Sequence, residues 1–130
     1  MRRYVFILGL LLPLISCEAI LDDAINCGPK DAVLEKKALR VGKLNANYVD
    51  SIKASIKNEP GDEDYPYNFY LDGDLPKGIY AEVHRNRVDI LGVPTETGSF
   101  RFKLTVSVTF GEDPTCSKSK TESYTITVTE

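Results

Sequence analysis

The sequence predicts an all-β fold, a sandwich of about seven short antiparallel strands, from two observations. Several runs alternate strictly between apolar and polar side chains, as expected where successive side chains of a strand point to opposite faces. Turn-forming clusters separate those runs, at 58–64 ("NEPGDED"), 72–78 ("DGDLPKG") and 92–98 ("GVPTETG"). Short alternating strands with turn signals between them are typical of a β-sandwich.

The first strand is the least defined. The composition of residues 30–42 ("KDAVLEKKALRVG") suits a helix, yet Leu39 and Val41 alternate with Arg40, and we favour a strand here. From Tyr48 onward the period is two, and the predicted inward residues of the next strand are Ile52, Ala54 and Ile56.

An aromatic run follows, with Tyr65, Tyr67 and Phe69 on one face and Tyr70 on the other. At a period of two the first three are predicted to join the core, which leaves Tyr70 as an exposed contact for a sugar or a protein. Val88 and Ile90 then alternate with polar neighbours, as a further strand would.

The clearest strands come last. The predicted core-facing residues of the first are Phe100, Phe102, Leu104, Val106, Val108 and Phe110, and those of the second are Tyr124, Ile126 and Val128. The residues between them are mostly Ser, Thr, Lys and Arg, which suit a solvated face.

The N-terminus has the layout of a secretory signal, because two arginines precede an apolar run that ends at a small residue. The run is too short to span a bilayer, which needs roughly 20 apolar residues. Leu14-Ile15-Ser16-Cys17 resembles the bacterial lipoprotein lipobox. The resemblance implies that residues 1–16 are a signal peptide and that Cys17 carries acyl chains, palmitate among them, that anchor the protein to a membrane. A secreted protein with an unpaired Cys17 is the alternative.

In Gram-negative lipoproteins an Asp after the lipidated cysteine favours retention at the inner membrane. Here Glu18 follows Cys17, so we expect localisation in the cell envelope, at the outer membrane. Residues 17–30 would form a lipidated tether, and residues 31–130 a single domain large enough to bury a core.

The charge balance excludes some partners. Removal of residues 1–16 takes away two arginines and no acid, which leaves 14 Lys and Arg against 19 Asp and Glu, a net charge of −5. Nucleic acid and anionic headgroups are poor partners for such a chain. Membrane attachment would come from lipid rather than from charge.

The remaining cysteines, Cys27 and Cys116, fit no zinc spacing, and the single histidine leaves too few metal ligands. Because an exported compartment permits disulfides, we predict that the two form a disulfide bond. Two separate buried thiols are the alternative.

Two linked motifs resemble the bacterial Ig-like, dystroglycan-type cadherin-like domain. They are Leu75-Pro76-Lys77-Gly78-Ile79 and Gly92-Val93-Pro94-Thr95, the latter followed by Gly98 and Phe100. The resemblance covers roughly residues 38–129 and implies an Ig-like sandwich used for binding or spacing rather than for a reaction. The family usually occurs in tandem arrays, whereas this chain has one such domain.

No motif for catalysis accompanies His84, which is predicted to lie at a turn or strand edge, so we expect no enzyme, cofactor or metal site. The acidic runs at 61–64 and 72–74 match no EF-hand loop, and solvated loops are the simpler interpretation. We therefore expect a membrane-anchored lipoprotein that binds a protein or glycan. The alternative is an immunity or inhibitor lipoprotein that neutralises a toxin or enzyme. The predicted contact residues, in turns that would point away from the membrane, are Asp72, Asp74, Glu96 and Thr97.

Overall fold

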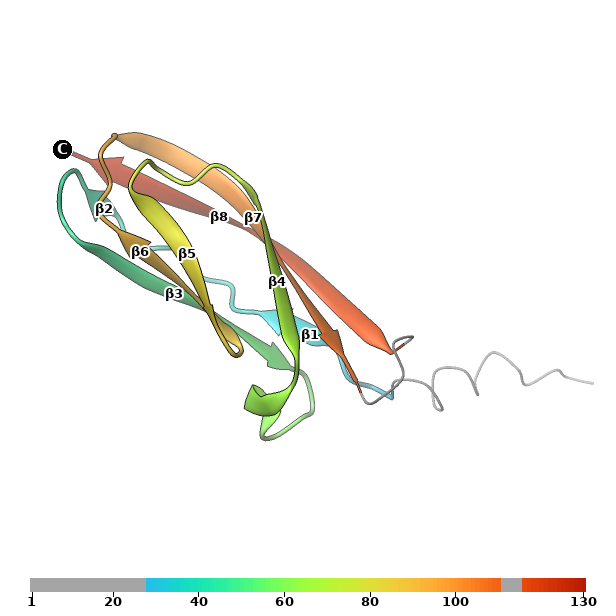
Figure 1. Cartoon of the computed structure of the whole chain (residues 1–130). Coiled ribbons are helices and arrows are strands. Elements are labelled where there is room, and N and C mark those ends of the chain that lie inside the picture. The colour runs from blue at the N-terminus through green and yellow to red at the C-terminus, as the bar shows by residue number, and fades with distance from the viewer. Residues whose placement is uncertain (1–27, 111–115) are drawn as a thin grey trace, which may run out of the picture.

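A computed structural model describes residues 28–110 and 116–130 as eight strands in two four-stranded sheets (Figure 1). One sheet has the order β1-β3-β6-β5 and the other the order β2-β8-β7-β4. The prediction of an all-β sandwich is confirmed, with one strand more than expected. The elements are β1 (Ala32–Leu34), β2 (Gly42–Lys43), β3 (Tyr48–Ile56), a 3₁₀ turn η1 (Asp62–Asp64), β4 (Tyr67–Gly73), β5 (Ile79–His84), β6 (Arg87–Gly92), β7 (Gly98–Thr109) and β8 (Ser117–Thr129).

The core lies between the sheets and includes most of the residues that alternation predicted, together with Ala32, Leu34, Ile79 and Cys116. The inward side chains of β3 and β6 are buried, and so are those of β7 from Phe102 onward and those of β8 from Tyr124 onward, whereas Phe100 is half-buried. Phe102 stacks on Tyr124 of the neighbouring strand, with ring centroids 5.7 Å apart. The long β7–β8 ladder therefore forms one wall of the core.

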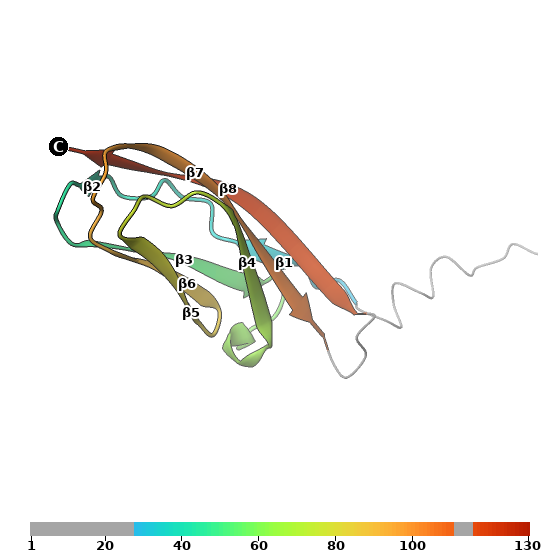
Figure 2. The same cartoon turned by 45° about the horizontal axis from the view of Figure 1, so that its top comes forward.

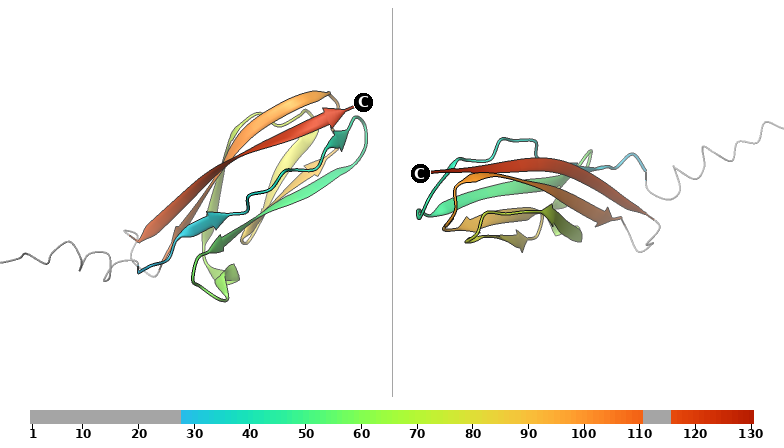
Figure 3. Two further views of the ribbon diagram at one scale, coloured as in Figure 1. Left: turned by 180° about the vertical axis from the view of Figure 1, so that it is seen from behind. Right: turned by 90° about the horizontal axis from the view of Figure 1, so that it is seen from above.

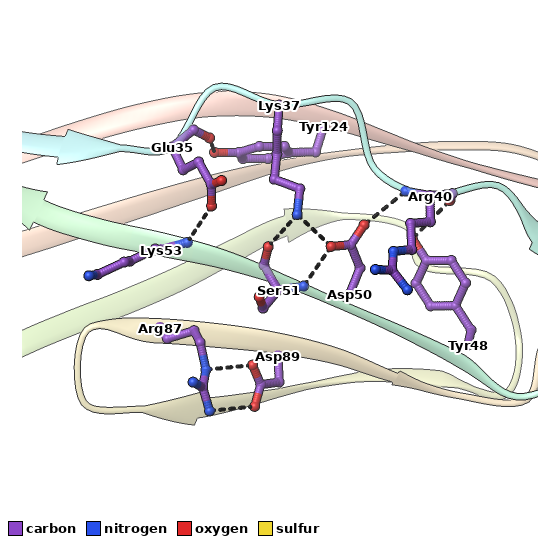
Figure 4. Close-up of polar contacts among 10 residues, drawn as sticks. All are labelled: Glu35, Lys37, Arg40, Tyr48, Asp50, Ser51, Lys53, Arg87, Asp89 and Tyr124. Atoms are coloured by element: carbon purple, nitrogen blue, oxygen red, sulfur yellow. Dashed lines mark hydrogen bonds and ion pairs between the residues drawn. The ribbon is translucent and has the colours of Figure 1, made fainter.

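A strand does form within residues 30–42, but it covers only Ala32–Leu34 and pairs antiparallel with β3. Leu39 is buried, yet the alternation around it does not continue as a strand. The backbone of Arg40 forms hydrogen bonds to side chains instead of to a neighbouring strand. Its N–H donates to a carboxylate oxygen of Asp50, and its carbonyl accepts a hydrogen bond from the Tyr48 hydroxyl (Figure 4). The chain rejoins a sheet at β2, which pairs in parallel with β8.

The aromatic run packs as predicted. Tyr65, Tyr67 and Phe69 are half-buried and contact the core, and Tyr65 meets Phe110 edge to face with centroids 5.9 Å apart. Tyr70, on the opposite face of β4, is 68% exposed. Before this strand, η1 forms a single 3₁₀ turn (Figure 2). A carboxylate oxygen of Asp62 accepts a hydrogen bond from the Ile56 N–H at 2.7 Å and so holds the turn to β3.

The sandwich is elongated and its two ends differ (Figure 3). One end holds the beginning of the described chain and the start of β8. The other, called the distal end below, holds the loops 44–47, 74–78 and 93–97 and the C-terminus. Cys17, Cys27, the predicted signal peptide and most of the predicted tether lie outside the described residues. No helix in the described part of the chain is long and apolar enough to cross a membrane.

Candidate binding site

The two motifs that suggested an Ig-like domain meet at the distal end. Val93 N–H donates to the Gly78 carbonyl at 3.1 Å, and Thr95 N–H to the Lys77 carbonyl at 2.9 Å. The N–H of Lys77 donates in turn to a carboxylate oxygen of Glu96 at 2.9 Å. A third loop joins them, because Asn45 N–H donates to the Pro94 carbonyl. The three loops are thus tied together by hydrogen bonds.

Two glycines make this contact possible. Gly78 has φ +88°, and a Cβ there would lie 2.0 Å from the Val93 carbonyl oxygen. Gly92 has φ +133°, and a Cβ there would lie 2.0 Å from the Gly78 carbonyl oxygen. Only glycine tolerates both the conformation and the close approach of the two chains. The motifs therefore shape the distal end and supply no reactive group.

The predicted contact residues lie in three different settings. Asp74 and Thr97 are exposed in the loops. Glu96 is half-buried and holds the backbone of Lys77, so its role is partly structural. Asp72 is exposed on β4, opposite Lys103 of β7, rather than in a turn.

A row of exposed apolar side chains, which the sequence analysis missed, crosses the outer face of one sheet beside these loops. Val49 of β3 lies opposite Leu91 of β6, and Leu91 lies opposite Tyr80 of β5. These three side chains and Val93 line one shallow hollow, and Val41 lines a second hollow that shares Val49 with the first. The five residues Val41, Val49, Tyr80, Leu91 and Val93 are called the distal patch below.

The distal patch is strongly exposed. Val41, Val49, Tyr80 and Val93 are 65%, 60%, 52% and 39% exposed, and Leu91 is half-buried. Contiguous exposed apolar surface often marks a binding site, whereas isolated apolar side chains on a surface need no explanation. Val33, Tyr70 and Val83 are the other large apolar residues that the structure exposes in its described part.

The outer face of the other sheet has a different chemistry. Hydroxyl side chains follow β7 and β8, and three cross-strand pairs of them are hydrogen bonded: Ser99–Thr127, Thr105–Thr121 and Thr109–Ser117. Such pairs stabilise a solvated sheet face. Of the two outer sheet faces, the one that carries the distal patch is therefore the better candidate for binding a partner.

A signal for the distal patch is present in the sequence. Along β3, β5 and β6 the polar phase carries charged or hydroxyl residues except at the end nearest the distal loops. At that end the outward-facing positions hold the apolar side chains of Val49, Tyr80 and Leu91 instead. Apolar residues on both phases of three strands, all at one end, indicate an exposed apolar surface once the register is known.

Tyr48 lines both hollows and acts as a neutral donor. It is buried, and its hydroxyl donates to the Arg40 carbonyl at 3.0 Å. Burial raises the pKa of Tyr48 to about 12, with a further contribution from the nearby Asp50 carboxylate. The phenol therefore keeps its proton and fixes the Arg40 backbone at the edge of the distal patch.

His84 has two acidic neighbours on the surface. It ends β5, with Nε2 3.4 Å from a carboxylate oxygen of Glu82 and 3.7 Å from one of Asp89. Within residues 28–110 and 116–130 no group of three or more His, Cys, Asp or Glu side chains is placed to hold a metal ion.

Comparison with known proteins assigns no family, because no family model and no curated protein sequence matches the chain. The case for function therefore rests on the geometry of the distal end.

Proposed function

We propose that this chain is a membrane-anchored, Ig-like lipoprotein of a bacterial cell envelope that binds a partner through its distal end. The lipobox-like segment supports acylation at Cys17 and release of residues 1–16. The predicted Cys27–Cys116 bond would tie the tether to the start of β8, at the end opposite the distal loops. An anchored molecule would then present the distal loops away from the membrane.

The observation that carries the proposal is the apolar row across β3, β6 and β5 at that end. A few residues supply most of the binding energy in protein interfaces, with Trp, Tyr and Arg frequent among them, while the apolar contacts around them exclude water. Four of the five patch residues are aliphatic, which favours a protein over a glycan as the partner. Tyr80 is the aromatic member and the expected energetic centre.

An immunity or inhibitor lipoprotein remains the second candidate. It would use the same surface to cover a toxin or enzyme, so the geometry of this chain supports both functions. Gene neighbourhood separates them, because an immunity gene would lie beside a toxin gene.

Tyr80→Ala tests the site, with Tyr70→Ala as the matched control. Both tyrosines are exposed on edge strands, but Tyr70 lies on the hydroxyl-rich face of the other sheet. We expect Tyr80→Ala to weaken binding of the envelope partner by about 30-fold, as loss of an interface centre worth roughly 2 kcal/mol would. Tyr70→Ala should change binding less than threefold. Isothermal titration with the purified partner measures both, and equal effects would place the site elsewhere.

A further inference from the structure

Three cationic side chains border the distal patch. Arg40 and Lys43 line the hollow that contains Val41 and Val49. Lys77 directly precedes Gly78, which lines the hollow that contains Tyr80. All three residues are exposed, and in the described part of the chain no carboxylate lies within ion-pair distance of their side chains.

Two acids near this rim, Asp50 and Glu96, are already engaged by other groups, whereas Asp74 and Glu130 at the distal end are exposed. Asp50 is buried and accepts hydrogen bonds from the Lys37 ammonium and the Arg40 N–H. Glu96 accepts the N–H of Lys77. The chain as a whole has a formal charge of −3, so an unpaired cationic rim around an apolar surface runs against the average charge of the molecule.

We propose that the partner is a protein whose contact surface is an apolar knob ringed by Asp and Glu carboxylates. This inference rests on the proposed function and specifies the chemistry of its partner. The distal patch would bury the knob, while Arg40 offers a guanidinium that can bind a carboxylate through two hydrogen bonds. Lys43 and Lys77 would raise the rate of encounter by attraction at a distance.

The rim also argues against a second copy of this chain as the occupant. Two distal ends that faced each other would bring Arg40, Lys43 and Lys77 of both copies together, and like charges across an interface cost free energy. With an acidic partner, the same three residues would instead contribute favourably to the free energy of binding.

Site-specific photo-crosslinking identifies the occupant. One variant of the full chain carries a benzoylphenylalanine in place of Val49 and is expressed in the cells that contain the natural protein. A second variant of the same chain carries the benzoylphenylalanine in place of Tyr70 and serves as the control. We expect a crosslink to another protein from position 49 and none from position 70. A crosslink only to a second copy, only to lipid or to nothing would overturn the inference.

Charge reversal on the purified partner then tests the chemistry. The distal variant carries Arg40→Glu, Lys43→Glu and Lys77→Glu. The control variant carries Lys57→Glu, Arg101→Glu and Lys103→Glu, three exposed sites away from the patch with the same change in net charge. We expect the distal variant to lower the association rate constant at least tenfold and to flatten its dependence on salt, with the control within threefold of the unaltered protein.

Two outcomes separate this inference from the proposed function. If Tyr80→Ala weakens binding but both charge variants behave alike, the site stands and the acidic partner is wrong. If Tyr80→Ala and Tyr70→Ala also behave alike, the distal site itself is wrong.

Discussion

Asp50 shows how one buried charge organises the segment before β3. Its carboxylate accepts hydrogen bonds from the Lys37 ammonium and from the N–H groups of Arg40 and Ser51 (Figure 4). Burial acts to raise the pKa of Asp50, but these hydrogen bonds outweigh it and the net pKa lies below the ordinary value. The ionised side chain thus holds the irregular residues 37–40 against the sheet.

Replacing Asp50 should therefore change how stability depends on pH. An Asp titrates near 3.9 in an unfolded chain and lower in this fold, so its contribution is present above roughly pH 4 and is lost as pH falls through the folded pKa. We expect Asp50→Asn to cost about 1–3 kcal/mol at pH 7. Urea unfolding at pH 7 and pH 3 should show a smaller difference in the variant than in the unaltered protein.

Asp89→Asn is the control, because the half-buried Asp89 pairs with the exposed Arg87 (Figure 4). Ion pairs with an exposed partner contribute little, so this variant should lower the free energy of unfolding at pH 7 less than Asp50→Asn does. A variant at Asp50 with unchanged pH dependence would contradict the assigned pKa.

At the scale of elements, the β4–β5 and β6–β7 connections depend on each other through Gly78 and Gly92. We expect Gly78→Ala to lower the free energy of unfolding by several kcal/mol, because a Cβ would meet the Val93 carbonyl oxygen at 2.0 Å and φ is +88°. Thermal unfolding followed by circular dichroism measures the loss.

Gly61→Ala is the control that separates the cost of the steric clash at residue 78 from the cost of a positive φ. Gly61 has φ +75°, but a Cβ there meets no atom within 4 Å. This variant should cost only about 1–2 kcal/mol, the usual cost of the left-handed conformation for a residue with a side chain. Equal losses at the two positions would mean that the two connections are not in close contact.

Alternation predicted the elements whose two faces differ in polarity. Ile52, Phe102 and Ile126 were placed inward by pattern alone and are buried. The short β1 and β2 could not be located in this way, because hydrogen bonds of Asp50 and Tyr48 to Arg40 decide where the chain leaves the sheet. The distal patch depends on strand register, which brings Val49, Leu91 and Tyr80 together from positions far apart in the sequence.

At the scale of the whole molecule, the predicted disulfide would link the tether to the sandwich. Cys116 is fully buried directly before β8, and its carbonyl accepts the Phe110 N–H at 2.8 Å. Cys27 lies outside the described residues, so its pairing with Cys116 stays a prediction. A bond between them would close a loop of nearly a hundred residues, worth roughly 4–5 kcal/mol in the chain-entropy model.

Cys27→Ser tests the bond without altering the buried side chain. Peptide mapping of unreduced protein should find Cys27 joined to Cys116. Urea unfolding should show a loss of roughly 4 kcal/mol in the variant, and this difference should vanish in reductant. Two free thiols in protein purified from the envelope would contradict the prediction.

The direction of β1 has a mechanical consequence. This strand leads from the end that holds the beginning of the described chain toward the distal end and pairs with β3 through Ala32–Leu34. Tension between a membrane anchor and a partner at the distal patch would pull along β1. The few hydrogen bonds between β1 and β3 would then bear the force at the same time, as a shear load. A covalent link from Cys27 to Cys116 would divert that tension to β8, which pairs with β7 from Ser117 to Val128. An anchored chain would then act as a tensile connector, with its longest ladder carrying the force.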